Sequence, residues 1–375
     1  MVIKMLDYKF ITYNRIFTAA RVMTLAAVIS LFFGCTKIDE DILPEADEGA
    51  AIVIINSTDN PQENNLDSTN IDYVKNALSA TECEAYDAIV EGVMSFSPYV
   101  NLPEIMTAEQ IKKLFTLVYT QESKFFWLSN IFYNTSEPSD TINLNFRYSK
   151  EKTDTMRAEL ELAIGTILGE LPNECSAYQA VKYFHDKIIT NCTFSKDYEH
   201  VNSAYGALVD GYAQCEGYAF AMSLLCDRSG IDNLVVTGTN SQGASHAWNK
   251  IKINGEWYNV DCTWDDPILK YDNSLFLKHD YLLVRDFDIL DITHFQNNDY
   301  FIPPSCTSED NNYFVMENLS FYEVDDGINS LHEQIKTQAL AGKREVEIQF
   351  KSYDIYNNAI QRLFDNKEIN TIISD

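Results

Sequence analysis

Residues 205–230 read YGALVDGYAQCEGYAFAMSLLCDRSG, and residues 243–267 read GASHAWNKIKINGEWYNVDCTWDDP. In the first stretch, apolar residues recur at helical spacing after Cys215, and Gly230 supplies a stop, so the pattern predicts a helix that begins at Cys215. The apolar positions are Ala219, Met222, Leu225 and Cys226. Unpaired backbone N–H groups and the helix dipole favour a thiolate over a thiol at such a position. Cys215 is therefore a candidate nucleophile.

The second stretch predicts a β-hairpin, because Asn254-Gly255 is typical of a two-residue turn between strands. If Ile253 pairs with Glu256, Trp248 lies opposite Asp261 and His246 lies opposite Thr263. His246 and Asp261 then become diagonal neighbours on one face, with backbone positions roughly 7–8 Å apart. The other face is apolar and is predicted to meet the core; it carries Ala247, Ile251, Ile253, Tyr258, Val260 and Cys262.

Each of these residues alone is more often structural than functional. A lone cysteine at a helix start is usually a small buried hydrophobe, and a lone histidine on a strand is usually a packing residue. The ordered set is harder to obtain by accident, so we interpret Cys215, His246 and Asp261 as nucleophile, base and orienting group. Zinc is a weaker alternative, because three ligands at most are present and no CxxC or HxxxH spacing occurs. We expect no metal and no cofactor.

The segments GYAQCEGYA and SHAWNKIKINGEWYNVDCTWDDP resemble the transglutaminase-like superfamily, whose members have a papain-like fold and a Cys-His-Asp triad. The resemblance covers about residues 175–300 and includes HDYLLV downstream. It implies an α+β core in which the nucleophile's helix packs on an antiparallel sheet, with Cys215, His246 and Asp261 as the triad. In papain-like proteins the oxyanion hole uses the nucleophile's N–H and an upstream side chain, which the sequence leaves unassigned.

The implied chemistry is acyl transfer through a thioester, in which Cys215 attacks an amide carbonyl of a peptide or protein substrate and His246 protonates the leaving amine. Water as acceptor gives a peptidase or amidase, and an amine gives a transglutaminase. Trp248 and Trp264 either line a substrate groove or are ordinary packing aromatics. Two alternatives remain open: a catalytically inactive binding or assembly module of the cell envelope, and a peptide N-glycanase-like deglycosylase.

The N-terminus resembles a bacterial lipoprotein signal. Four basic residues precede an apolar run at 22–33, which Gly34 and Cys35 end; they are Lys4, Lys9, Arg15 and Arg21. The sequence LFFGC resembles a lipobox, although Phe32 stands where an aliphatic residue is usual. We expect lipidation at Cys35, a membrane anchor through its acyl chains, and a location in the bacterial cell envelope. A signal peptide cleaved elsewhere, or a retained anchor helix, is the alternative.

Charge and cysteine count narrow the function classes. The formal net charge of −28 argues against nucleic-acid binding and against docking on anionic lipid through a basic patch. Of eight cysteines, lipidation would use Cys35 and catalysis Cys215. The other six could form three disulfides in 15 ways, although Cys226 and Cys262 fall at core positions and are equally suited to be buried thiols.

The chain divides into five predicted segments: a signal peptide at 1–34, an acidic flexible linker at 35–70, an N-terminal α+β region at 71–170, a transglutaminase-like domain at 171–300 and a C-terminal α+β region at 301–375. Within 71–170 we expect helices near 80–95 and from Thr107, where TAEQ is a capping-box signature, and strands at 124–133 and 141–148. This region is predicted to pack on the triad domain and to form one wall of a groove. Beyond 310 the pattern predicts strand, helix, strand, helix.

Overall fold

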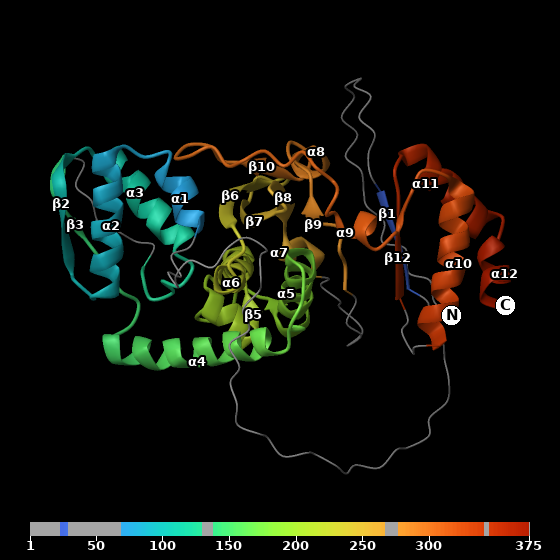
Figure 1. The fold of residues 1–375 in the computed structure, drawn as a ribbon, viewed down its shortest axis with the longest axis horizontal. Coiled ribbons are helices and arrows are strands. Elements are labelled where there is room, and N and C mark those ends of the chain that lie inside the picture. Colours follow the sequence, from blue (N-terminus) through green and yellow to red (C-terminus); the bar gives the residue numbers. More distant parts are fainter. Residues whose placement is uncertain (1–22, 29–68, 130–137, 267–276, 341–344, 375) are drawn as a thin grey trace, which may run out of the picture. The chain divides into compact units, whose positions relative to one another are not determined.

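The computed structural model describes residues 23–28, 69–129, 138–266, 277–340 and 345–374 (Figure 1). They fall into two compact units: a larger unit within Ala50–Leu277 and Tyr281–Glu309, and a smaller unit within Met1–Gly49, Lys278–Asp280 and Asp310–Asp375. The predicted boundary near residue 170 lies inside the larger unit. Cys35 and nearly all of the predicted linker lie outside the described residues. Among the described helices, none combines the length and apolar composition needed to cross a bilayer.

A five-stranded antiparallel sheet forms the centre of the larger unit, in the order β10-β6-β7-β8-β9. The strands are β6 (Asn233–Asn240), β7 (Ser245–Ile253), β8 (Glu256–Val260), β9 (Leu282–Val284) and β10 (His294–Gln296). The predicted hairpin register is confirmed, because Ile253 pairs with Glu256. Asn254 and Gly255 have φ of 54° and 87°, the left-handed conformation that a tight hairpin turn between twisted strands requires.

Both faces of this sheet are buried, which the alternating pattern does not predict. The predicted core face is buried from Ala247 to Cys262, but Trp248, Lys250 and Asn259 on the opposite face are each at most 1% exposed. Helix α6 (Cys215–Arg228) packs on β6 and β7 and is buried throughout its middle. It begins at Cys215 and is followed by Gly230 at φ 66°, so its predicted start and stop are confirmed.

The N-terminal part of the larger unit is mostly helical. It contains α1 (Thr69–Lys75), α2 (Ala80–Met94), β2 (Tyr99–Met106), α3 (Ala108–Gln121), β3 (Ser139–Asn143) and α4 (Lys150–Gly169). The capping box at Thr107 is confirmed, with Gln110 as its partner. The strand predicted at 124–133 is wrong over residues 124–129, where turns run from Ser123 to an isolated bridge between Leu128 and Phe146. Residues 130–133 of that prediction lie outside the described residues. The strand predicted at 141–148 is displaced, since β3 ends at Asn143 and pairs with β2.

One side chain ties this N-terminal part to the central sheet. Strand β10 pairs with β6 at Gly238–Asn240, so no described strand pairs with Val235 on that side of β6. The side-chain amide of Gln121 makes the two backbone hydrogen bonds that a neighbouring strand would make. Its Nε2 donates to the Val235 oxygen at 2.8 Å, and its Oε1 accepts from the Val235 N–H at 3.3 Å. The predicted packing of the N-terminal region on the sheet is thus confirmed.

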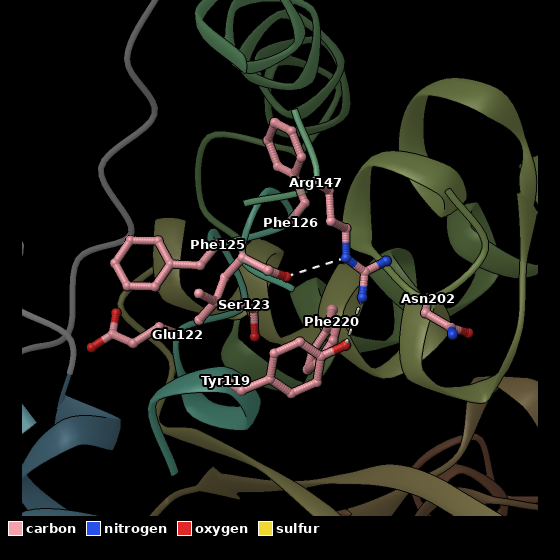
Figure 2. Close-up of a pocket in the computed structure, with 9 residues that line it drawn as sticks. Tyr119, Glu122, Ser123, Phe125, Phe126, Arg147, Asn202 and Phe220 are labelled. Atoms are coloured by element: carbon pink, nitrogen blue, oxygen red, sulfur yellow. Dashed lines mark hydrogen bonds between the residues drawn. The ribbon is translucent and has the colours of Figure 1, made fainter. Parts of the chain in front are cut away.

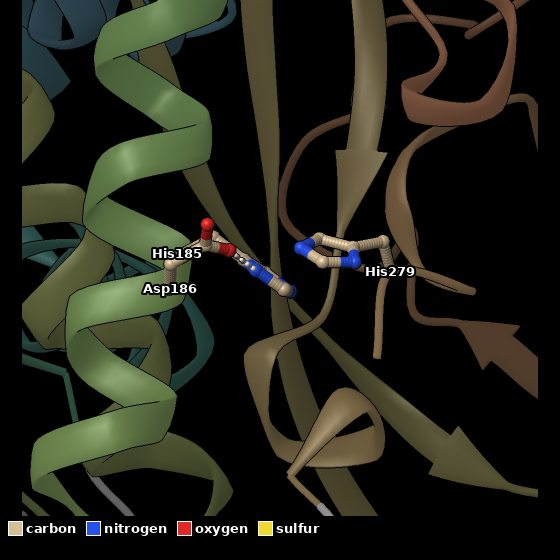
Figure 3. Close-up of side chains that lie close together, drawn as sticks. All are labelled: His185, Asp186 and His279. Carbon is tan, nitrogen blue, oxygen red and sulfur yellow. Dashed lines mark hydrogen bonds and ion pairs between the residues drawn. The ribbon is translucent and has the colours of Figure 1, made fainter. Parts of the chain in front are cut away.

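The described part of the larger unit contains six further short or flanking elements. They are α5 (Ala177–Asn191), β4 (Thr193–Phe194), the π-helical turn η1 (Gly206–Asp210), β5 (Tyr212–Ala213), α7 (Cys262–Asp265) and α8 (Asp286–Ile289). Helices α5 and α7 both pack on α6. His185 of α5 is fully buried between two carboxylates, with Nδ1 3.1 Å from Asp186 (Figure 3) and Nε2 3.0 Å from Asp265 of α7. This bond holds α7 against α5.

The smaller unit has its own core. A three-stranded sheet in the order β1-β12-β11 packs against α10 and α11, and α12 contacts η2 and α10. The elements are β1 (Met23–Val28), α9 (Tyr313–Met316), β11 (Ser320–Phe321), α10 (Val324–Leu340), β12 (Glu345–Phe350), α11 (Tyr353–Ile360), η2 (Gln361–Asp365) and α12 (Glu368–Ser374). The predicted order of strand, helix, strand, helix is confirmed in β11 to α11. Strand β1 belongs to the segment expected to be a signal peptide, an interpretation that stays a prediction.

Candidate active site

Cys215 is the first residue of α6 and is held there by backbone contacts. Strand β5 pairs in parallel with β4 and leads into the helix, and the Gln214 N–H donates to the Val201 oxygen at 2.8 Å. The helix start lies so close to this segment that a Cβ at Gly217 would be 2.5 Å from the same oxygen. Only glycine permits that approach. Cys215 is half-buried and its thiol is free.

Asp261 occupies a different local structure from the one predicted. The register predicts that β8 continues through Asp261 and Thr263, but the strand ends at Val260 and Asp261 is the N-cap of α7. Its Oδ1 accepts from the backbone N–H groups of Thr263 at 2.9 Å and Trp264 at 3.2 Å. These bonds fix the carboxylate plane, because an N-cap oxygen replaces the missing helical acceptor.

The structure brings Asp261 and His246 into direct contact. His246 Nε2 lies 2.5 Å from Asp261 Oδ2, and the two side chains are 4% and 1% exposed. An ionised carboxylate only accepts hydrogen bonds, so the imidazole donates its Nε2–H and its Nδ1 remains for Cys215. Interactions with the Cys215 side chain contribute to the protonation equilibrium of His246. The three predicted residues therefore meet, and their catalytic role stays a prediction.

His294 is a fourth member of the site that the sequence patterns do not predict. It lies on β10, is fully buried, and places Nε2 2.8 Å from the same Asp261 oxygen that His246 uses. Its Nδ1 lies 2.8 Å from the Thr293 hydroxyl. A single histidine on a three-residue strand, 33 positions from its partner, carries no local signal. Asp261 thus has four hydrogen-bond donors around it.

These contacts determine the charges in the site. Burial acts to lower the pKa of His246, but the charge and hydrogen bond of Asp261, with a smaller effect of Cys215, outweigh it and raise this pKa to about 10. Burial acts to raise the pKa of Asp261, but His246 and then His294 hold it well below its usual range. Both directions favour an imidazolium–carboxylate pair at neutral pH. Such a pair provides a positive charge beside the Cys215 thiol.

Two tryptophans pack around these rings. Trp248 is 1% exposed, stacks 5.9 Å from His246 and donates its Nε1–H to Asn259 at 3.1 Å. Trp264 is half-buried and contacts His246 at 6.0 Å and His294 at 5.1 Å between ring centroids. Neither is among the residues that line the cavity beside Cys215. A role in a substrate groove stays a prediction, while the structure places both as ring contacts of the site.

A cavity of about 640 Å³ opens beside Cys215. The cavity is lined by the loop residue Asn202, by the start of α6, and by residues on or beside β6, β7 and β10. The lining residues are Asn202, Gln214, Cys215, Glu216, Thr237, Gly238, Thr239, Ser245, His246, Ala247, Phe295 and Asn297. No described residue of 71–170 is among them, so the groove wall expected from the N-terminal region stays a prediction. The amides of Asn202 and Gln214 are candidates for the second oxyanion donor.

The other described cysteines do not compete with Cys215 as the nucleophile, and the two histidines of the site are both engaged with Asp261. All seven described cysteines are free, and burial raises the pKa of Cys226 and Cys262 well above the usual value, so these two are unreactive buried thiols. His246, Asp261 and His294 place ligand atoms within 4.8 Å of one another, a spacing that could hold a metal ion. In this structure Nε2 of His246 and Nε2 of His294 are both hydrogen-bonded to the Asp261 carboxylate. Zinc bonds of about 2.0 Å to these nitrogens would replace both hydrogen bonds.

Comparison with known proteins finds one matching family model and several similar proteins. Residues 166–262 match the family model of the transglutaminase-like superfamily. The human protein Kyphoscoliosis peptidase is 27% identical over 160 residues, which cover 36% of this chain and 22% of that protein. The mouse protein of the same name is 28% identical over 104 residues, 22% of this chain and 15% of that protein. The chain therefore spans about a fifth or less of the length of these curated relatives.

Two solved structures are also similar to parts of the chain. A candidate cysteine protease from Cytophaga hutchinsonii is 22% identical, with a TM-score of 0.24 over 29% of this chain and 37% of that one. The crystal structure of a TGase is 15% identical, with a TM-score of 0.28 over 47% of this chain and 53% of that one. With scores this low, neither likeness says anything about the reaction of this chain.

Proposed function

We propose that this chain, whose residues 166–262 form a transglutaminase-like domain, is a thiol enzyme that hydrolyses or transfers the acyl groups of peptide or protein amides. One observation carries the proposal: His246 is paired with buried Asp261 at 2.5 Å and interacts with Cys215, which lines an open cavity at the start of α6. A nucleophile, a base and an orienting group in contact beside a cavity are the parts of covalent acyl transfer.

The reaction follows from these positions. Cys215 attacks the amide carbonyl as a thiolate, and the C–N bond breaks as His246 gives its Nδ1 proton to the leaving amine. The Cys215 backbone N–H and an amide of Asn202 or Gln214, all residues of the cavity lining, would bind the developing oxyanion. Water or an amine then attacks the thioester, transfers a proton to His246 and releases Cys215. Asp261 remains ionised throughout and keeps the imidazole oriented.

The first test is the rate at which iodoacetamide alkylates Cys215 between pH 5 and 9, measured by peptide mass spectrometry on the full chain. Because the pKa of His246 is raised to about 10, the imidazolium persists at neutral pH, and we expect Cys215 labelling at pH 6 to stay near its value at pH 8. A free thiol is only about 0.3% ionised at pH 6. Cys215 should therefore react about 10- to 100-fold faster there than an ordinary thiol.

The chain supplies its own reference thiols for this measurement. Cys83 and Cys175 are half-buried and free, and neither lines the cavity. In His246→Ala the fast reaction of Cys215 at pH 6 should fall to the level of these two cysteines. If native Cys215 labels no faster than they do, the thiolate–imidazolium pair is absent and the enzyme proposal is wrong. Amine incorporation, peptide cleavage and glycan release, assayed on the reactive protein, then separate the transglutaminase, peptidase and deglycosylase alternatives.

We further propose that the chain is exported and anchored in the bacterial envelope by lipid on Cys35, a proposal supported by the basic and apolar leader and LFFGC. Processing before Cys35 would remove β1 and leave β11 as the one described strand beside β12. Expression in a bacterium fed an alkyne-tagged palmitate should label the protein, and Cys35→Ala should abolish the label. Equal labelling of both proteins, or none of the native protein, would refute lipidation at this residue.

A further inference from the structure

The cavity beside Cys215 has one charged residue that the proposed reaction does not use. Apart from Cys215 and His246, Glu216 is the only ionisable side chain among the residues that line it. The other polar lining groups are amides and hydroxyls, supplied by Asn202, Gln214, Thr237, Thr239, Ser245 and Asn297. Glu216 directly follows Cys215, so their Cα atoms are about 3.8 Å apart, and successive helix residues point about 100° apart. A group that binds Glu216 therefore sits to the side of the nucleophile.

Within the part of the chain that the structure describes, the Glu216 carboxylate makes no hydrogen bond and no ion pair. It is half-buried, and its pKa is raised because burial disfavours the charged form more than the attraction of Arg147 favours it. A partly desolvated carboxylate without donors is costly for the free protein. A cation bound in the cavity would supply both the charge and the donors that are missing.

Arg147, the cation that attracts Glu216, is committed to other partners. Its Nε donates to the Leu128 oxygen at 3.2 Å, and its Nη2 donates to the Tyr119 hydroxyl at 3.4 Å, in a neighbouring small pocket (Figure 2). Arg147 is not among the residues that line the cavity beside Cys215. It therefore favours the ionised form of Glu216 without itself lining that cavity.

We propose that Glu216 determines specificity by binding a cationic group of the acyl-donor substrate, a lysine or arginine side chain or an N-terminal ammonium, next to the carbonyl that Cys215 attacks. The assignment rests on the proposed function, because it places the substrate by the nucleophile. Charge-assisted hydrogen bonds are about twice as strong as neutral ones. We expect the preference for a cationic over a neutral isostere to be about 10- to 100-fold.

The test uses chloromethyl ketones that alkylate Cys215, so no natural substrate is needed. Acetyl-lysyl, acetyl-norleucyl and acetyl-glutamyl chloromethyl ketones are compared on the full chain, with rates normalised to iodoacetamide. An alanyl chloromethyl ketone with a free amine and its acetylated form distinguish an N-terminal ammonium from a side chain. In the native chain at least one cationic probe should react about 10- to 100-fold faster than its neutral partner, and this ratio should decrease with salt.

Variants of Glu216 connect the preference to its carboxylate. Glu216→Gln should reduce the ratio to about 1, and Glu216→Asp, which keeps the charge, should retain most of it. Glu256→Gln, at the exposed first residue of β8, is the matched control and should keep the native ratio. Equal rates of cationic and neutral probes in the native chain, or an unchanged ratio in Glu216→Gln, would overturn the proposal. Because iodoacetamide carries no charge, fast labelling by it without a cationic preference rejects the role of Glu216 alone and leaves the proposed function intact.

Discussion

Replacing Asp261 by Asn is expected to lower kcat/KM by about 10³- to 10⁴-fold, although the side chain keeps its size. The reason is the direction in which the amide must lie. Oδ1 of Asp261 accepts from the Thr263 and Trp264 N–H groups, which can only donate. The asparagine oxygen must therefore take that position, and its NH₂ group must face Nε2 of His246 and of His294.

The NH₂ group in that position forces the wrong histidine tautomer. Nε2 of His246 must become an acceptor, so the neutral ring carries its proton on Nδ1 and cannot take one there. The imidazolium also loses the charge that raises its pKa to about 10. Cys215 labelling at pH 6 should consequently approach that of Cys83, in parallel with the loss of turnover on whichever amide substrate the screen identifies.

A second histidine–aspartate pair provides the control for this variant. His200 Nδ1 lies 2.5 Å from Asp210 in the same unit, and neither residue lines the cavity. Asp210→Asn should leave Cys215 labelling near the native rate. If Asp261→Asn retains native labelling and turnover while its circular dichroism is unchanged, Asp261 does not orient His246 for catalysis, and the proposed mechanism is wrong at that step.

The parts of the fold that sequence patterns predict are those specified by neighbouring residues. The turn at Asn254-Gly255 and the register it sets, the helix start at Cys215 and the capping box at Thr107 all depend on contacts within a few positions. Backbone conformation and capping act at that range, so the same residues produce the same local structure in many folds. The pattern at Cys215 therefore placed the helix start correctly.

The parts that patterns do not predict depend on distant residues. Asp261 leaves the strand because its carboxylate caps α7, and α7 is held through Asp265 by His185, 80 positions away. His294 reaches Asp261 only because β10 pairs with the far end of β6. Nothing next to either histidine in the sequence marks these contacts. The triad could be nominated from spacing and resemblance, whereas its supporting histidine required the fold.

Lys250, at the centre of the sheet, is another residue whose contacts the sequence pattern does not predict. Its replacement is expected to have the largest effect on the stability of the larger unit. It sits on β7, where alternation places it on the predicted polar face, yet its side chain is fully buried. Its Nζ donates to Asp286 at 2.9 Å and to the Pro304 oxygen at 2.7 Å. Asp286 also accepts from Asn259 and from the Cys306 N–H, both at 2.9 Å. The lysine thus neutralises a carboxylate that joins β7, β8 and the 304–306 segment.

Lys250→Met should lower the free energy of unfolding of the larger unit by about 3 kcal/mol, because it leaves Asp286 without its counter-ion in a mostly buried position. Urea unfolding followed by tryptophan fluorescence measures this directly, since all four tryptophans, at positions 127, 248, 257 and 264, lie in that unit.

Lys252→Met is the matched control two positions away: Lys252 lies 3.4 Å from Asp232 and is 38% exposed, so its loss should cost less than about 1 kcal/mol. Equal losses of unfolding free energy in the two variants would mean that the buried ion pair stabilises the unit no more than the exposed one. Restored stability in Lys250→Met combined with Asp286→Asn would instead show that the unpaired charge, and not the lost side chain, is what destabilises the sheet.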